Sequence, residues 1–381
     1  MPFILGFAAA TAALDAIQLG ILLALRTVGF LVGVPIGGVL ADRGGRRRIL
    51  LLAGLIAAAG TLLTSLVVGG SAPAGFLLVA TGVVLSGIGQ GASRPVYQAI
   101  VPAIVSRADF QAANAALSLS ARSTILIGPA AAVLIATVLG LAAAFVAIFA
   151  LWMVSALVPP WRGVVGKTAP DDVHRTARSY RFATDLVERL REARRHPWFF
   201  AGLAALSAVI ATGYSVTNVL TPQLSQAIFG DASLLAGTAT SYGCGAVAGA
   251  IILSNWNPAR RGWWALAGLG IYGTVPMSLL FSETYWIPAI AYFAAGFGAE
   301  LFNIIWFTAI QQEIAENKLA RVSSLDFIVS YGLAPLGLSI IAPLAEWVGT
   351  SSVLVATSII CFLAAFFACA APTSSNFRLN R

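Results

Sequence analysis

A glutamate lies deep inside an apolar run near the C-terminal end of the chain. Glu300 follows Gly296-Phe297-Gly298-Ala299 and precedes Leu301-Phe302. An acid at the centre of a membrane helix costs about 2.5–3.5 kcal/mol on insertion scales, so it normally faces a cavity or a partner. We therefore treat Glu300 as a candidate proton carrier, with Asp15 as a second. The alternatives for Glu300 are a structural ion pair with an arginine such as Arg122, or a position nearer the membrane interface.

Two arginines, Arg26 and Arg122, also lie inside apolar runs. Arginine that faces lipid is costly, so we expect both side chains to line a central cavity. Either one would hold an anionic substrate there or neutralise an acid. For Arg26 the nearest acid along the chain is Asp15, about three helical turns away.

Further polar and aromatic residues belong to the same set of runs. Asn303 and Trp306 follow the glutamate and are candidate substrate contacts. Aromatic side chains in such segments mostly pack helices or form interface belts, and this alternative stays open for Trp306. Asp326, Glu283 and Glu346 lie near the ends of their runs, where we expect the membrane interface.

The composition indicates that membrane-spanning helices position these residues. The chain is 59% hydrophobic and 10% charged, with a mean hydropathy of +0.87, whereas soluble domains carry about 25% charged residues. Apolar runs of roughly 18 residues or more are typical of membrane helices. A shorter apolar segment, Pro2–Leu14, precedes the first run. The predicted spans are 17–40, 49–69, 74–97, 113–139, 141–161, 198–221, 232–254, 262–281, 284–308, 322–347 and 350–372.

The basic residues follow alternate loops between these spans. All but three of the 23 Lys and Arg lie in the loops 42–48, 98–112, 162–197, 255–261 and 309–321 or in the C-terminal tail. This positive-inside pattern places those loops and the C-terminus in the cytoplasm. It also argues against a nucleic-acid-binding surface as the reason for the net charge of +8.

The loop at 38–48 holds one acid and four arginines between two spans. It resembles the signature loop between the second and third helices of the major facilitator superfamily, roughly G-x-L-A-D-R-x-G-R-R. The resemblance implies a conformational switch in which the acid latches onto the start of the eleventh helix, here Val322-Ser323-Ser324. The alternative is a cluster of charges that only sets topology. The matching residues are Gly38, Leu40, Ala41, Asp42, Arg43, Gly45, Arg46 and Arg47.

Two further motifs are similar to those of antiporters in this superfamily. Ile127-Gly128-Pro129-Ala130 resembles their Gly-Pro motif, which implies a kink at Gly128 and Pro129. Gly87-Ile88-Gly89-Gln90-Gly91 departs from the R-x-x-Q-G pattern of many drug antiporters, because Gly87 stands where the arginine is expected. Whether Arg94 substitutes for it stays open. The stretches 101–114, 190–197 and 320–326 look like the enterobactin-exporter-like branch of bacterial exporters.

An internal repeat supports the organisation that the resemblance implies. An offset of 213 residues relates Asp42 to Asn255, Arg47 to Arg260 and Gln98 to Gln311. The implied fold is an all-α polytopic membrane protein with two pseudo-symmetric six-helix halves, here eleven full spans plus a partial first helix. We expect an N-terminal half at 1–161, a cytoplasmic linker with an amphipathic helix at 162–197, and a C-terminal half at 198–381. A late start and a truly truncated first helix are both open explanations for the short Pro2–Leu14.

The sequence contains no Walker loop, zinc-ligand spacing or nucleophile elbow, so we expect neither an enzyme nor a bound cofactor or metal. The resemblance implies a secondary active transporter of the multidrug-resistance type, a proton antiporter that exports small drug-like molecules or siderophores by alternating access. We expect a monomer in the lipid bilayer of a bacterial plasma (inner) membrane, with a small-molecule substrate, protons and no nucleic acid as partners. The alternatives are an uptake or uniport carrier of the same fold, or a truncated membrane protein that does not transport.

Overall fold

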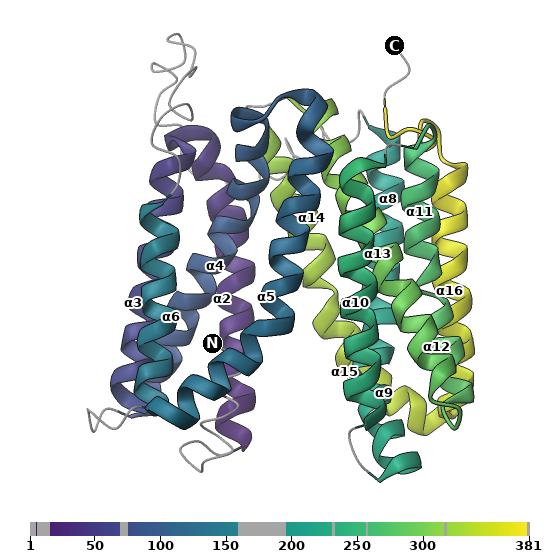
Figure 1. The fold of residues 1–381 in the computed structure, drawn as a ribbon, viewed down its shortest axis with the longest axis horizontal. Helices are drawn as coiled ribbons and strands as arrows, with labels where there is room; N and C mark the ends of the chain where they lie inside the picture. Colours follow the sequence, from purple (N-terminus) through teal and green to yellow (C-terminus); the bar gives the residue numbers. More distant parts are fainter. Residues whose placement is uncertain are drawn as a thin grey trace. The chain divides into compact units, whose positions relative to one another are not determined.

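The computed structural model describes residues 5, 16–68, 75–158, 196–230, 233–256, 258–315 and 318–378. Every regular element in these residues is a helix (Figure 1). The chain forms two compact units, described separately below. Unit 1 is Met1–Ile104, Ile127–Leu186 and Ala315–Ile328, and unit 2 is Val105–Leu126, Val187–Ile314 and Val329–Arg381. Because α5 and α14 contribute to both units, the halves expected at 1–161 and 198–381 stay a prediction.

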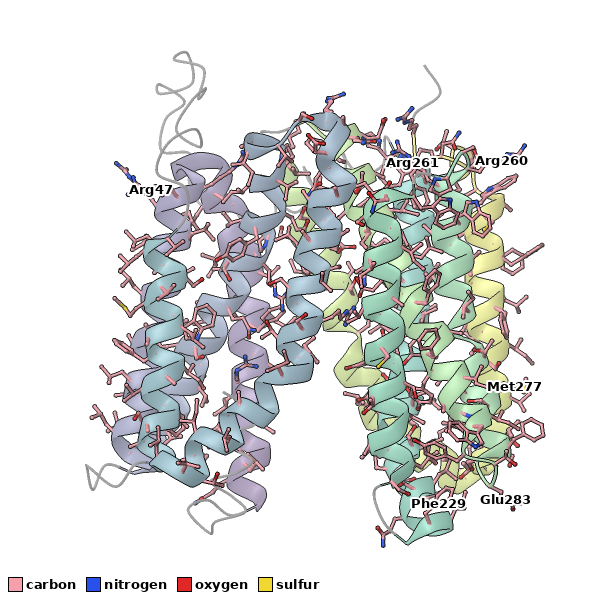
Figure 2. The ribbon with its side chains drawn as sticks, in the orientation of Figure 1. Arg47, Phe229, Arg260, Arg261, Met277 and Glu283 are labelled. Atoms are coloured by element: carbon pink, nitrogen blue, oxygen red, sulfur yellow. The ribbon has the colours of Figure 1, made fainter. Side chains whose placement is uncertain are left out.

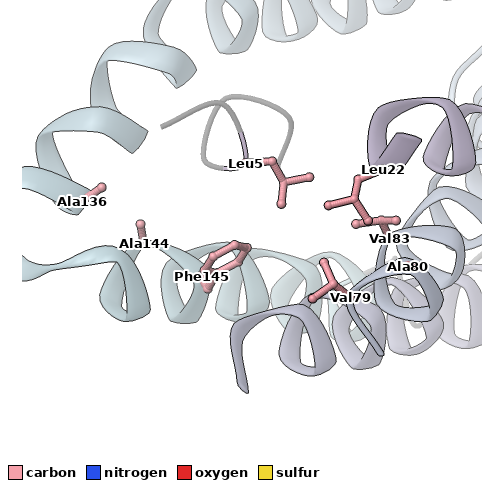
Figure 3. Close-up of a cluster of buried hydrophobic side chains, with 8 residues drawn as sticks. All are labelled: Leu5, Leu22, Val79, Ala80, Val83, Ala136, Ala144 and Phe145. Atoms are coloured by element: carbon pink, nitrogen blue, oxygen red, sulfur yellow. The ribbon is translucent and has the colours of Figure 1, made fainter. Parts of the chain in front are cut away.

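Unit 1 is a helical bundle with an apolar core. Its helices are α2 (Ala16–Gly44), α3 (Arg46–Val68), α4 (Phe76–Ile104), the end of α5 (Phe110–Leu139), α6 (Leu141–Leu157) and the first part of α14 (Leu319–Gly332). Leu5, from the short N-terminal apolar segment, is fully buried in this core beside Leu22 (Figure 3). Leu5 therefore contributes to the packing of unit 1. The cluster comprises Leu5, Leu22, Val79, Ala80, Val83, Ala136, Ala144 and Phe145.

Helices α2 and α4 of unit 1 pack backbone against backbone. A Cβ at Gly87 would overlap the carbonyl oxygen of Arg26, and one at Gly91 would overlap that of Phe30. Glycine has no side chain, so it permits this approach, which is typical of helix contacts in membranes. The close crossing brings the side chains that flank these glycines within reach of α2.

Unit 2 carries its basic and acidic loops at opposite ends. Arg260 and Arg261 lie at one end of the bundle, whereas Glu283 and Phe229 lie at the other (Figure 2). Its helices are α8 (Pro197–Ala208), a π-helical turn (Val209–Tyr214), α9 (Ser215–Phe229), α10 (Ser233–Asn255), α11 (Arg261–Ile271), α12 (Thr274–Ser278), α13 (Trp286–Glu313), α15 (Ala334–Val348), α16 (Thr350–Ala370) and the first part of α5.

The C-terminal tail of unit 2 folds back onto the ends of α8 and α11. The backbone N–H groups of Gly262 and Trp263 donate to the carbonyl oxygen of Ser375, at 3.0 and 3.3 Å. Two residues later the ring of Phe377 is fully buried and stacks on Trp198, with ring centroids 5.1 Å apart. The tail thus closes an aromatic cluster at the basic end of the unit.

The hydropathy pattern predicted where the helices lie better than it predicted where they are interrupted. Eight described helices or continuous helical runs are long and apolar enough to cross a membrane, so the protein is a multi-pass membrane protein. Helices α5 and α6 occupy two more of the predicted spans. The span predicted at 322–347 is instead two helices, α14 and α15, which are separated at Leu333. Pro335, at the start of α15, explains this break because it has no N–H for a continuous helix.

Candidate functional site

The buried acid Glu300 is held on α13 where α10 crosses it closely. Its side chain has no exposed surface. A Cβ at Gly249 of α10 would lie only 3.1 Å from the Cβ of Glu300, and one at Gly245 would overlap the carbonyl oxygen of Phe293. The two glycines therefore let α10 pass directly beside the acid and exclude solvent from that side.

Arg122 of α5 is the partner of this acid. Its Nε and Nη2 both lie against Oε1 of Glu300, in an ion pair whose side chains are 23% and 0% exposed. The Arg122 guanidinium also lies over the ring of Tyr242 on α10, 6.0 Å from the centroid, within reach of a cation–π interaction. The structural alternative weighed for Glu300 is therefore present, and it joins α5 to α13.

The two oxygens of the Glu300 carboxylate are not equivalent. Oε1 receives the contacts from Arg122, whereas Oε2 is buried and has no hydrogen-bond partner. A carboxylate that is ionised accepts hydrogen bonds at both oxygens, and a buried acceptor left unpaired costs about 1–3 kcal/mol. The pair is thus only half satisfied, and Oε2 is an oxygen at which a proton would not displace the arginine.

The other two candidates on α13 differ in their surroundings. Asn303 is half-buried one turn beyond Glu300. Trp306 is fully buried and makes stacked or edge-on ring contacts with Trp198, Phe199 and Phe302. Its surroundings fit the packing alternative that the sequence left open, whereas Asn303 stays beside the acid.

Amide side chains form a second link between α5 and α13, which the sequence did not indicate. Asn114 Nδ2 donates to Gln311 Oε1 at 2.7 Å and to Thr308 Oγ1 at 3.0 Å. Near the start of α5, Gln111 Nε2 donates to the carbonyl oxygen of Leu253 at 2.7 Å, which links α5 to α10 instead. Little signal for this link was available in the sequence, because Gln111 and Gln311 fall in predicted loops and an amide carries no charge that singles it out.

Arg26 meets a different partner, within unit 1. Its Nη2 donates to Gln90 Oε1 on α4, while its Nε is buried without a hydrogen-bond partner. Arg94, one turn beyond Gln90, is exposed and near enough for its charge to act on Arg26. The arginine that contacts Gln90 is thus Arg26 of α2, and whether Arg94 substitutes for the arginine absent from position 87 stays open.

The signature loop is helical except for one residue. Helix α2 continues through Asp42 and Arg43 to Gly44, and α3 begins at Arg46. Gly45, with a φ of +88°, is the link between them, in a conformation that favours glycine. Gly38 and Ala41 are buried, whereas Leu40, Arg46 and Arg47 are half-buried.

Several predicted features lie outside the described residues. They include Asp15, the side chains of Asp42, Arg43 and Pro129, and the amphipathic segment of the linker. The latch between Asp42 and the start of the eleventh helix therefore stays a prediction. The backbone of α5 is helical through Gly128 and Pro129, and the two units divide α5 between Leu126 and Ile127, directly before this Gly-Pro step.

The three acids expected at the membrane interface differ in the exposure of their side chains. Glu283 and Glu346 are exposed, in line with an interfacial position. Asp326 is only 2% exposed, so it is packed among protein side chains, and its interfacial position stays a prediction.

Three solved structures that match this chain are described as transporters or a transporter homologue. The human organic anion transporter MFSD10 (TETRAN) matches with a TM-score of 0.73 at 15% identity, over 96% of this chain and 88% of that one. An outward-facing bacterial homologue of the iron transporter ferroportin matches at 0.72 and 12%, over 97% and 95%. The proton:xylose symporter XylE matches at 0.67 and 11%, over 94% and 88%. At these identities the likeness concerns the fold.

Sequence comparison identifies the family directly. Among curated proteins no significant match was found. The model of the Major Facilitator Superfamily, however, matches residues 1–338, which is most of the chain. The helical architecture, the membrane-length spans and the transporter structures of the same fold agree with this match. The chain therefore belongs to the Major Facilitator Superfamily and is a membrane transporter rather than an enzyme.

Proposed function

We propose that this protein is a proton-coupled exporter of small amphipathic molecules that works by alternating access. The observation that carries the proposal is the buried pair of Arg122 and Glu300, which joins α5 to α13 inside the membrane-spanning part of unit 2. Ionisable residues within membrane helices are costly and are typical of proton and substrate pathways.

Glu300 has the chemistry that proton coupling requires. Its Oε2 accepts a proton without displacing the Arg122 contacts at Oε1. Protonation then removes the negative charge that attracts the guanidinium. The link between α5 and α13 weakens, although the Arg122 contacts at Oε1 are not displaced. Proton uptake and loss at this one oxygen would thus favour different arrangements of the two helices, as alternating access requires.

The direction and class of cargo are proposed from sequence motifs. The Gly-Pro step at Gly128-Pro129 resembles that of antiporters, and three stretches look like the enterobactin-exporter-like branch. We therefore propose efflux of drug-like compounds or siderophores across a bacterial inner membrane, with the C-terminus in the cytoplasm and the monomer as the working unit. The solved structures of the same fold include a proton symporter, so uptake is the outcome against which export is tested.

The test is cargo-driven proton movement in proteoliposomes with a pH-sensitive dye inside. Erythromycin, enterobactin and ethidium are added in turn under an imposed pH gradient. We expect at least one of them to dissipate the gradient through the wild-type protein and none to do so through Glu300→Gln. Glu300→Asp, which keeps the acid but shortens it, is expected to retain part of the flux.

Glu283→Gln is the matched control, because it makes the same change at an exposed acid of the same unit. It should behave as wild type. Wild-type coupling in Glu300→Gln would remove Glu300 from the mechanism and overturn the proposal. Cargo movement in the same direction as protons would retain Glu300 but replace export by uptake.

A further inference from the structure

The two intramembrane arginines are not equivalent in the structure. Arg122 has the carboxylate of Glu300 as its partner. Among the described residues, the side-chain partner of Arg26 is the neutral amide oxygen of Gln90, and its Nε is buried without a hydrogen-bond partner there. In the part of the chain that the structure describes, no acid lies against Arg26. One arginine is thus neutralised internally, while the other keeps its positive charge.

A second cation strengthens the charge at Arg26. Arg94 lies four residues after Gln90, so both project from the same face of α4, and the charge of Arg94 acts repulsively on Arg26. An arginine within a membrane helix is costly when nothing neutralises it. A partly buried cation with a second cation near it is an unfavourable arrangement if its only task is packing.

The scaffold around Arg26 fixes its position. The contact of Gly87 with the backbone of Arg26 locks the crossing of α2 and α4 at this level. Gln90 accepts from Nη2 and so holds the guanidinium in one orientation. A guanidinium held in this way presents a planar fork of donors that matches a carboxylate or sulfonate.

We propose that Arg26, Gln90 and Arg94 form a binding site for the anionic group of an organic anion with an apolar body. Its role in transport rests on the proposed function, but its ability to bind does not. The carboxylate or sulfonate accepts from Arg26 and is neutralised jointly by Arg94, and the apolar spans around it accommodate the rest of the molecule. Gln90 is a positioning residue that acts through Arg26.

The test uses three ligands that differ only in charge: 4-phenylbutyrate, 4-phenylbutanamide and 4-phenylbutylamine. Binding to the purified full-length protein in detergent is measured by calorimetry and by the rise in thermal unfolding midpoint. We expect the wild-type protein to bind the acid and to be stabilised by it, with no effect of the amide or the amine. Arg26→Gln should weaken binding of the acid by about 10- to 100-fold, the loss expected for a charge-assisted hydrogen-bonded pair.

Arg26→Lys and Arg107→Gln are the companion variants. Arg26→Lys keeps the charge but loses the fork, so it should fold and bind the acid less tightly than wild type. Arg107→Gln removes one positive charge from an exposed position and should bind as wild type. Without ligand, Arg26→Gln should unfold at a higher temperature than wild type, because it removes a charge without a carboxylate partner. An arginine with a purely structural role would show the opposite sign.

Three results overturn the site. The first is equal binding of the acid and the amide by the wild-type protein, and the second is undiminished binding of the acid by Arg26→Gln. The third is an internal ion pair with Asp15: Asp15→Asn and Arg26→Gln would each lower the unfolding midpoint, and the double variant would lower it no further. The proposed function fails separately, because wild-type proton coupling in Glu300→Gln overturns the proton mechanism and leaves binding of the acid at Arg26 unchanged.

Discussion

Replacement of Phe377 by alanine tests whether the C-terminal tail is a structural part of unit 2. The ring is fully buried against Trp198, and it also meets Trp306 edge-on with centroids 5.6 Å apart. Its backbone has a φ of +52°, in the left-handed region that a bulky residue rarely adopts. The backbone of the tail is therefore strained at Phe377, the residue whose ring packs against Trp198 and Trp306.

The magnitude follows from these two features. Loss of a buried phenylalanine ring costs about 3–5 kcal/mol. The left-handed conformation costs a non-glycine residue about 1–2 kcal/mol, which glycine does not lose. Phe377→Ala should thus weaken docking of the tail by at least about 3 kcal/mol, or roughly 100-fold in the docked-to-free ratio. Phe377→Gly should be less damaging than Phe377→Ala by about 1 kcal/mol.

Hydrogen exchange reports this docking directly, because the amides of Gly262 and Trp263 donate to the tail at Ser375. In Phe377→Ala these two amides should exchange about 100-fold faster, as the tail leaves them open to water. Phe366→Ala is the matched control, since that ring is 67% exposed on α16. Unchanged exchange at Gly262 and Trp263 in Phe377→Ala would refute the view that the ring anchors the tail.

Three further changes probe the helix contacts. Gly87→Ala forces α2 and α4 apart and should cost about 1–3 kcal/mol, seen as a lower thermal unfolding midpoint, whereas Gly75→Ala, with open space around it, should not. Removal of one partner of the buried pair, by Arg122→Met or Glu300→Leu, should destabilise the protein by about 3–5 kcal/mol. The double variant should unfold near the wild-type midpoint. Additive losses in the double variant would contradict the pairing. Asn114→Ala removes the hydrogen bonds that Asn114 donates to Thr308 and Gln311 on α13 and should cost about 1–3 kcal/mol by the same measurement, with no loss if α5 does not pack there.

Membrane spans were predictable because hydropathy over some 20 residues depends on composition alone. The interruption at Leu333 was not, since Pro335 is apolar enough to leave the hydropathy of its span unchanged while it removes a backbone donor. The burial of Asp326 was not predictable either, because it depends on the helices that pack against α14, which one sequence does not specify.

The candidate site divides along similar lines. Glu300 and Arg122 were recognisable because charges within apolar runs are few, so the number of possible pairs was small. The partner of Arg26 was not recognisable, because Gln90 is a neutral amide whose position opposite Arg26 depends on the glycine contact between α2 and α4. Sequence indicates which charges must be accommodated, whereas the crossing of helices decides which of them meet.

The internal repeat relates two helix pairs that hold opposite charges. The offset of 213 residues relates Gly87 of α4 to Glu300 of α13. At position 87 the backbone of α2 leaves no room for a side chain, and the charge of that crossing is Arg26, on α2 itself. At position 300 the glycine lies on the neighbouring helix, as Gly249 of α10, so α13 has room for an acid. Both helices of each pair carry contact glycines, such as Gly33 on α2 and Gly296 on α13. The difference between a glycine at position 87 and an acid at position 300 is therefore local to that position, and related scaffolds hold a cation in unit 1 and an acid in unit 2.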